Sequence, residues 1–275
     1  MKPKYLNPYT DFGFKKLFGE EVSKDLLIDF LNQLLPSYHQ IVELQFKNPE
    51  NFNDTAKERR AIFDIYCQAE NGAKFIVEMQ KAKVNYFKDR SLFYSTFPIR
   101  GQAEKGDWDF KLLPIYFIAI LDFHYDEQEE ERKFRRDVSL KDQDDDIFYD
   151  KLHFKFLQMP LFNKQAHELE SHFDKWGYFL KNLESFDHIP AILNEPIFNK
   201  GFDIAQISHL NPDQYETYQK SLIEYWEVNS VKETAFNEGK LEGKLEVAYV
   251  LKQQQVATAI IMAATGLTQQ KIENL

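Results

Sequence analysis

The chain has 275 residues, of which 43% are hydrophobic and 28% are charged, a balance that excludes a wholly disordered or low-complexity protein. A single cysteine, Cys67, excludes an intrachain disulfide and a zinc site built from cysteines, and it agrees with the reducing cytosol. The longest apolar run, residues 112–121, contains Pro114 and is too short to span a bilayer. We therefore expect a soluble, cytoplasmic protein with no membrane partner.

Charge is distributed unevenly along the chain. The net charge of −10 argues against a generally basic nucleic-acid coat. Residues 81–111 nevertheless carry seven basic and four acidic side chains, a net charge of +3. Residues 122–150 carry five basic and twelve acidic ones, a net charge of −7. The acidic total is thus compatible with a local basic surface.

Hydrophobic periodicity in the first half predicts a helical segment, three strands, a helix and a strand, in that order. The expected ranges are helices at 10–18 and 24–35, strands at 41–46, 61–68 and 75–80, a helix at 86–104 and a strand at 112–123, with a polar loop at 48–58. The last strand is almost continuously apolar, so it should be buried on both faces of a sheet, between the two groups of helices.

The second half is expected to be mainly helical. Two weaker strands are expected at 134–140 and 151–158, and helices follow within 164–183. Asn211-Pro212 is typical of a helix start, and a long helix should extend past Lys240, although two glycines argue against an unbroken one. A small helical hairpin, with Gly266 as the C-cap, should close the chain. We expect three parts, namely a core at 1–122, an elaboration with a hairpin and helices at 123–205, and a helical tail at 206–275.

Two acidic residues, Asp64 and Glu78, interrupt apolar strands that a predicted hairpin connects. A three-residue loop at 70–72, whose glycine is left-handed, would place Asp64 opposite Glu78. A two-residue loop at 71–72 would instead place Asp64 opposite Met79. We favour the three-residue loop, which puts both carboxylates on one face of the hairpin.

In the favoured register the two carboxylates would lie about 5 Å apart at Cβ and should repel each other. A divalent cation between them would turn this repulsion into a binding site, and Mg²⁺ suits carboxylates that leave positions for water. The alternative interpretation is that both acids are simply solvated on one face of the hairpin.

Asp64 followed by Glu78-Met79-Gln80, together with the order of elements, resembles the PD-(D/E)XK nuclease superfamily. Residues that are similar to its recombination-promoting nuclease or putative transposase family are DFGFKKLFG at 11–19, VEMQ at 77–80, Arg90 with Tyr94, LPI at 113–115, WGYFL at 176–180, EGKLEGKLE at 238–246 and TGLT at 265–268. The resemblance covers nearly the whole chain. It implies an α/β (α+β) fold with a restriction-endonuclease-like core, α-β-β-β-α-β around a mixed sheet, and a helical C-terminal extension.

The resemblance also implies a metal-dependent DNA endonuclease that hydrolyses phosphodiester bonds and is linked to recombination or transposition. Asp64 and Glu78 would hold Mg²⁺, with Mn²⁺ as an alternative, and the Met79 carbonyl would assist. Gln80 would orient a water molecule. An additional acid could come from the first helix, either Asp11 or Glu20.

One position departs from the superfamily pattern, because Gln80 stands where a lysine is usual. An amide can orient water but carries no positive charge. Lys83 could supply that charge, whereas Lys81 should point to the opposite face. The alternative function is therefore a catalytically weak or inactive nuclease-fold protein that acts as a DNA-binding or protein-interaction module.

DNA is the implied partner. Lys83, Arg90 and Arg100 are candidates for phosphate contacts, which position DNA without reading its sequence. Each could equally be an ordinary solvated charge. The short last helix carries few charges, which favours packing or oligomerisation over recognition of a DNA groove, and a homodimer is the second candidate partner.

Overall fold

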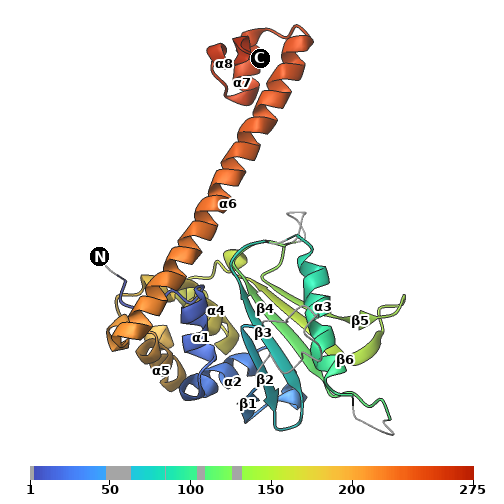
Figure 1. Cartoon of the computed structure of the whole chain (residues 1–275), viewed down its shortest axis with the longest axis vertical. Coiled ribbons are helices and arrows are strands. Elements are labelled where there is room, and N and C mark those ends of the chain that lie inside the picture. The colour runs from blue at the N-terminus through green and yellow to red at the C-terminus, as the bar shows by residue number, and fades with distance from the viewer. Residues whose placement is uncertain (1–2, 48–62, 84, 104–108, 126–131) are drawn as a thin grey trace. The chain divides into compact units, whose positions relative to one another are not determined.

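A mixed β-sheet of six strands forms the centre of the first part of the chain (Figure 1). The two compact units of the chain, Met1–Tyr225 and Trp226–Leu275, are described separately. This computed structural model describes residues 3–47, 63–83, 85–103, 109–125 and 132–275.

The strands lie in the order β1-β2-β3-β4-β6-β5. Their bounds are β1 (Leu44–Phe46), β2 (Ile65–Ala69), β3 (Lys74–Gln80), β4 (Ile115–Leu121), β5 (Arg135–Lys141) and β6 (Ile147–Gln158). β4 pairs in parallel with β3 and β6, and the other neighbours are antiparallel. The predicted mixed sheet is confirmed, and the two weaker predicted strands extend it beyond β4.

Helices cover both faces of this sheet (Figure 1). One face carries α1 (Asp11–Phe18), α2 (Lys24–Asn32), α4 (His172–Asn182) and α5 (Pro196–Ile204), and the other carries α3 (Phe87–Arg100). Side chains alternate along a strand, so Ile118 of β4 packs with the first group and Phe117 packs with α3. Every residue of β4 is buried, which confirms the strand predicted to be covered on both faces.

The predicted helix at 24–35 and the predicted strand at 41–46 are both shorter in the structure, because side chains form hydrogen bonds with backbone groups at their ends. α2 ends at Asn32 rather than at residue 35, and the Arg135 guanidinium donates to the carbonyls of Gln33 and Leu34 at 3.3 Å each. The Asn32 amide bonds the N–H and the carbonyl of Ile41, at 2.9 and 2.8 Å. These bonds hold Ile41 outside the sheet, so β1 begins only at Leu44.

Other starts and ends follow local signals. Thr10 Oγ1 accepts a hydrogen bond from Gly13 N at 3.0 Å and caps α1, which begins at Asp11 within the predicted helix at 10–18. The sequence did not predict α5. The predicted polar loop at 48–58, the first two residues of the predicted strand at 61–68, and Glu104 at the end of the predicted helix lie outside the described residues.

The C-terminal part of the chain begins with the long helix α6 (Pro212–Gln253), and the boundary between the two units falls within this helix. Asn211 Oδ1 accepts a hydrogen bond from Gln214 N at 2.9 Å, and α6 continues unbroken through Gly239 and Gly243, so the long helix expected to pass Lys240 is confirmed. The predicted hairpin is confirmed as α7 (Thr258–Thr265) and α8 (Gln269–Glu273), joined by a left-handed Gly266.

In the unit Trp226–Leu275, a small core of Ala248, Ile261, Leu267 and Ile272 joins the hairpin to α6. Among the described residues, no helix has both the length and the apolar character that a membrane span requires. The three predicted parts, 1–122, 123–205 and 206–275, stay predictions.

Candidate active site

Asp64 and Glu78 lie opposite each other at the open end of the β2–β3 hairpin. Ile65 pairs with Val77, so the next pair outward is Asp64 with Glu78. At the closed end Ala69 N donates to Ala73 O at 2.9 Å. The three-residue loop and its register are therefore confirmed, and the alternative two-residue loop is wrong.

The loop closes this way because Gly72 has φ +85°, a left-handed conformation that glycine adopts at little cost. Asn71 Oδ1 accepts a hydrogen bond from Ala73 N at 2.9 Å and stabilises the turn. These local interactions set the register of the strands and thereby decide which side chain faces Glu78.

Glu78 is buried and Asp64 is half-buried, and each carboxyl group accepts a hydrogen bond from a residue of β3. Glu78 is only 2% exposed, and its Oε2 accepts a hydrogen bond from Gln80 Nε2 at 2.7 Å. Asp64 Oδ2 accepts from Met79 N at 2.7 Å. The other oxygen of Glu78, Oε1, is buried and has no hydrogen-bond partner among the described residues.

Burial raises the pKa of both acids. Burial first, and then the neighbouring Asp64 carboxylate, raise the pKa of Glu78 to about 8, although the charge of Arg90 opposes this shift. Burial also raises the pKa of Asp64, while the Met79 N–H lowers it. The ionised forms of this pair are thus unfavourable unless positive charge lies beside them.

The chemistry of these groups fits a hard divalent cation. Two facing carboxylates, one with an unpartnered buried oxygen, offer oxygen ligands and a net negative charge. Within the described residues, no group of three or more His, Cys, Asp or Glu side chains is arranged to hold a metal. A cation here would therefore depend on two carboxylates, backbone oxygen and water.

Asp11 and Glu20, the two candidate additional acids, differ in whether their charge acts on Asp64. The negative charge of Asp11 contributes to the raised pKa of Asp64, although Asp11 itself pairs with Lys15 at 2.9 Å. Glu20 pairs with Lys16 at 3.0 Å. Asp11 is thus the one of the two whose charge acts on the carboxylate pair.

The basic residues that the sequence predicted do not all lie near Asp64 and Glu78. Arg90 lies near enough to lower the pKa of Glu78, and its guanidinium stacks over the Tyr94 ring at 4.9 Å. Lys81, expected on the opposite face, still lowers the pKa of Asp64. Arg100 ends α3, about 15 Å along the helix from Arg90, and is not brought to the same place.

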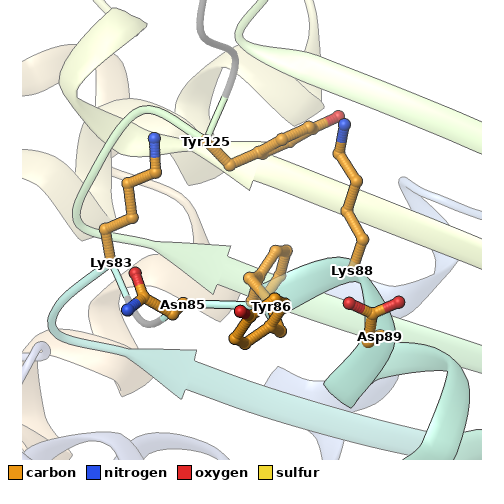
Figure 2. A pocket seen from close by; sticks show the side chains of 7 residues that line it. Lys83, Asn85, Tyr86, Lys88, Asp89 and Tyr125 are labelled. Carbon is orange, nitrogen blue, oxygen red and sulfur yellow. The ribbon is translucent and has the colours of Figure 1, made fainter.

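A cavity of about 560 Å³ lies between the segments that follow β3 and β4 (Figure 2). Its lining comprises Lys83, Asn85, Tyr86, Phe87, Lys88, Asp89 and Tyr125. Lys83 and Lys88 extend on either side of the Tyr125 ring, and Lys88 Nζ lies 5.5 Å from the ring centroid. Because β3 and β4 are parallel, their carboxyl ends meet at one edge of the sheet, beside Gln80.

Of the residues that line this cavity, Lys83 was predicted from the sequence, whereas Lys88, Tyr86 and Tyr125 were not. Lys88 and Tyr86 lie in the basic stretch, yet nothing in the sequence distinguishes them from ordinary surface residues. Tyr86 has φ +62°, unusual for a residue with a side chain, and is 78% exposed. Tyr125 joins the cavity only because β4 runs beside β3.

The comparisons with known proteins are consistent with this geometry. A family model described as PD-(D/E)XK nuclease family transposase matches residues 8–235. Neither the curated proteins nor the solved structures gave a match. The matched range includes the whole sheet, Asp64, Glu78 and the cavity. The chain belongs to the PD-(D/E)XK nuclease family transposases.

Proposed function

We propose that this chain is a metal-dependent DNA endonuclease that hydrolyses phosphodiester bonds during recombination or transposition. The observation that carries this proposal is the facing pair of Asp64 and Glu78, where the buried Oε1 of Glu78 has no hydrogen-bond partner among the described residues. An unpartnered buried oxygen costs free energy, and coordination to a cation would remove that cost.

In the proposed site Asp64 and Glu78 hold Mg²⁺, or Mn²⁺, with assistance from the Met79 carbonyl. A divalent cation bound there supplies an activated water and neutralises charge on the phosphate. Gln80 fixes one oxygen of Glu78 through its amide N–H, and this leaves the other oxygen available as a ligand. Its amide carbonyl can accept a hydrogen bond from the attacking water.

The proposed DNA contacts come from the cavity and from α3. Lys83 and Lys88 present their ammonium groups on either side of Tyr125 and can bind phosphate oxygens (Figure 2). Arg90 lies over the Tyr94 ring and near Glu78, so it can bind a phosphate next to the cation. Arg100, at the far end of α3, would contact phosphate farther along the DNA.

One observation favours the alternative, a catalytically weak or inactive nuclease fold that binds DNA or protein. The position that usually carries a lysine is Gln80, and its amide nitrogen is engaged by Glu78. Positive charge near the reacting phosphate would then come from residues outside that position, such as Arg90, Lys81 and the cavity lysines. This arrangement predicts slow cleavage compared with a site that has its own lysine.

The test is cleavage of supercoiled plasmid by the full chain in Mg²⁺ and in Mn²⁺. We expect nicked or linear product that disappears in excess chelator. Asp64→Asn should abolish cleavage because it removes charge from the cation site, and DNA binding should remain equal or become slightly tighter. Glu224→Gln replaces an exposed acid on α6 and is the matched control.

Two results would contradict the proposal. Cleavage that persists in chelator, or in the Asp64→Asn variant, would exclude a metal mechanism at this pair. DNA binding without cleavage in any divalent metal would support the binding-module alternative. Calorimetric titration of Mn²⁺ into both proteins separates loss of metal binding from loss of chemistry.

A further inference from the structure

The repeat EGKLEGKLE at residues 238–246 gives α6 four chemically distinct rows. A helix has 3.6 residues per turn, so residues four apart lie nearly above one another. A repeat of four residues therefore places identical residues in a row along one side of the helix. The rows are Glu238, Glu242 and Glu246; Gly239 and Gly243; Lys240 and Lys244; and Leu241 and Leu245. Around the helix the glycine row lies between the glutamate row and the lysine row.

Among these rows the structure gives a packing partner only to Leu245, since Leu241 is exposed. Leu245 packs on the small core that α6 forms with α7 and α8. The glycine row lies on the opposite side and is exposed, and a Cβ atom added to Gly239 or Gly243 would meet no heavy atom within 4 Å. Nothing described in the unit Trp226–Leu275 therefore requires glycine at these two positions.

Exposed apolar side chains extend the glycine row in both directions. At about 100° per residue, Phe236, Val247 and Val250 all fall within about 40° of Gly243 around the helix. All three are exposed, and Phe236 is 68% exposed. The result is an apolar strip with a shallow centre, where another backbone could approach closely.

The four rows are costly for a helix that stays alone. Each glycine within a helix lowers its stability relative to alanine. Like charges four residues apart, as in Glu242 with Glu246 or Lys240 with Lys244, also destabilise a helix. A partner that fills the glycine row and faces each charged row with the opposite charge would offset both costs.

We propose that a second copy of this chain packs on the strip formed by Phe236, Gly239, Gly243, Val247 and Val250, with the two α6 helices parallel. The charges determine the orientation. In a parallel two-fold pair the left flank of one helix faces the right flank of the other, so glutamates face lysines. In an antiparallel pair each flank faces its own copy, and glutamates would face glutamates.

Crosslinking through single cysteines tests this orientation in the full chain. Phe236 and Val250 are about 21 Å apart along the helix. In a parallel dimer Phe236→Cys should form a disulfide with itself, Val250→Cys should do the same, and a mixture should give no mixed product. The native Cys67 is buried and stays in place. Thr234→Cys, on the opposite side of the helix, is the matched control and should not crosslink.

Charge exchange tests the partner. Glu242→Lys with Glu246→Lys makes both flanks basic, and Lys240→Glu with Lys244→Glu makes both flanks acidic. Each double variant should raise the dimer dissociation constant by about tenfold or more, and an equimolar mixture should restore a dimer. Sedimentation measures the assembly, and far-UV circular dichroism checks that α6 stays helical.

The inference fails if the wild-type chain is monomeric at every concentration, or if the mixture of Phe236→Cys and Val250→Cys gives mainly the mixed product, which indicates antiparallel helices. It also fails if both charge variants dimerise as well as the wild type. These results are independent of nuclease activity, because assembly is measured without DNA or metal.

Discussion

Gln80 Nε2 donates a 2.7 Å hydrogen bond to Oε2 of Glu78, whereas the neighbouring Oε1 is buried and has no hydrogen-bond partner in the part of the chain that the structure describes. The residue that replaces the usual lysine thus holds the acid in place rather than neutralising it. We therefore expect the ionised carboxylate of Glu78 to be unfavourable without a cation and to be stabilised when a cation binds.

The first prediction concerns the stability of the metal-free protein. Glu78→Gln should leave the free energy of unfolding in chelator unchanged or raise it by up to about 1 kcal/mol, because it removes an ionisable group that burial and Asp64 disfavour. We expect Mg²⁺ to raise the melting temperature of the wild type, and this increase should disappear in Glu78→Gln. Thermal unfolding in chelator and in Mg²⁺ measures both effects.

Glu224→Gln is the control for that experiment, since it removes one acid from an exposed position. It should keep the full response to Mg²⁺. An equal Mg²⁺ response in Glu78→Gln would show that the cation binds elsewhere.

The second prediction concerns DNA binding by the cavity and α3. Combining Lys83→Ala with Arg90→Ala should weaken binding and reduce the slope of log affinity against log salt by about 2, since each phosphate contact contributes about 0.9 on duplex DNA. Affinity across a salt series measures both quantities. Lys111→Ala removes an exposed base elsewhere, and a change in slope as large as that of the double variant would contradict the prediction.

The third prediction concerns the turn that sets the register. Gly72 has φ +85°, and a Cβ atom at this position would lie 2.7 Å from Leu113 Cδ1. Gly72→Ala should reduce the free energy of unfolding by about 1–2 kcal/mol. In Gly72→Asn the new side chain meets the same neighbour, but asparagine tolerates the left-handed conformation better, so the free energy of unfolding should fall by less. Urea unfolding measures both variants. Equal decreases in the free energy of unfolding would show that the contact with Leu113, and not the backbone conformation, causes the destabilisation.

The fourth prediction concerns pH. His172 Nε2 lies 2.7 Å from Asp29 Oδ1, and this hydrogen bond raises the pKa of His172 in the folded state, with Glu195 nearby in support and Lys175 opposed. Because the pKa of His172 is higher in the folded state, its protonation stabilises the fold. This stabilisation is complete below the pKa of histidine in the unfolded state, about 6.5, and it is lost as the pH rises through the pKa of His172 in the folded state. Stability should therefore fall by less than about 1 kcal/mol over that window, because the pair is partly exposed.

His172→Gln should remove that part of the pH dependence while the Trp176 hydrogen bond to Asp29 remains. His188→Gln, at an exposed histidine, controls for the loss of one histidine. Urea unfolding at a series of pH values provides the comparison, and an unchanged slope in His172→Gln would contradict the assignment.

Local chemistry in the sequence was sufficient for much of the fold. The loop count around Gly72 predicted that Asp64 faces Glu78, because strand pairing propagates from the turn with a period of two. The apolar run at 112–121 predicted a strand covered on both faces. Asn211 marked the start of one helix and Gly266 the end of another, since each signal depends on hydrogen bonds or dihedral angles within a few residues.

The tertiary structure decided what the sequence left open, because those features depend on segments far apart in the chain. Asn32 holds Ile41 out of β1, and Arg135 engages the last carbonyls after α2. The charge of Arg90 acts on Glu78, whose Oε1 has no partner among the described residues, because α3 packs on that face of the sheet. Burial and the approach of distant charges arise from packing, and no pattern of neighbouring residues carries that information.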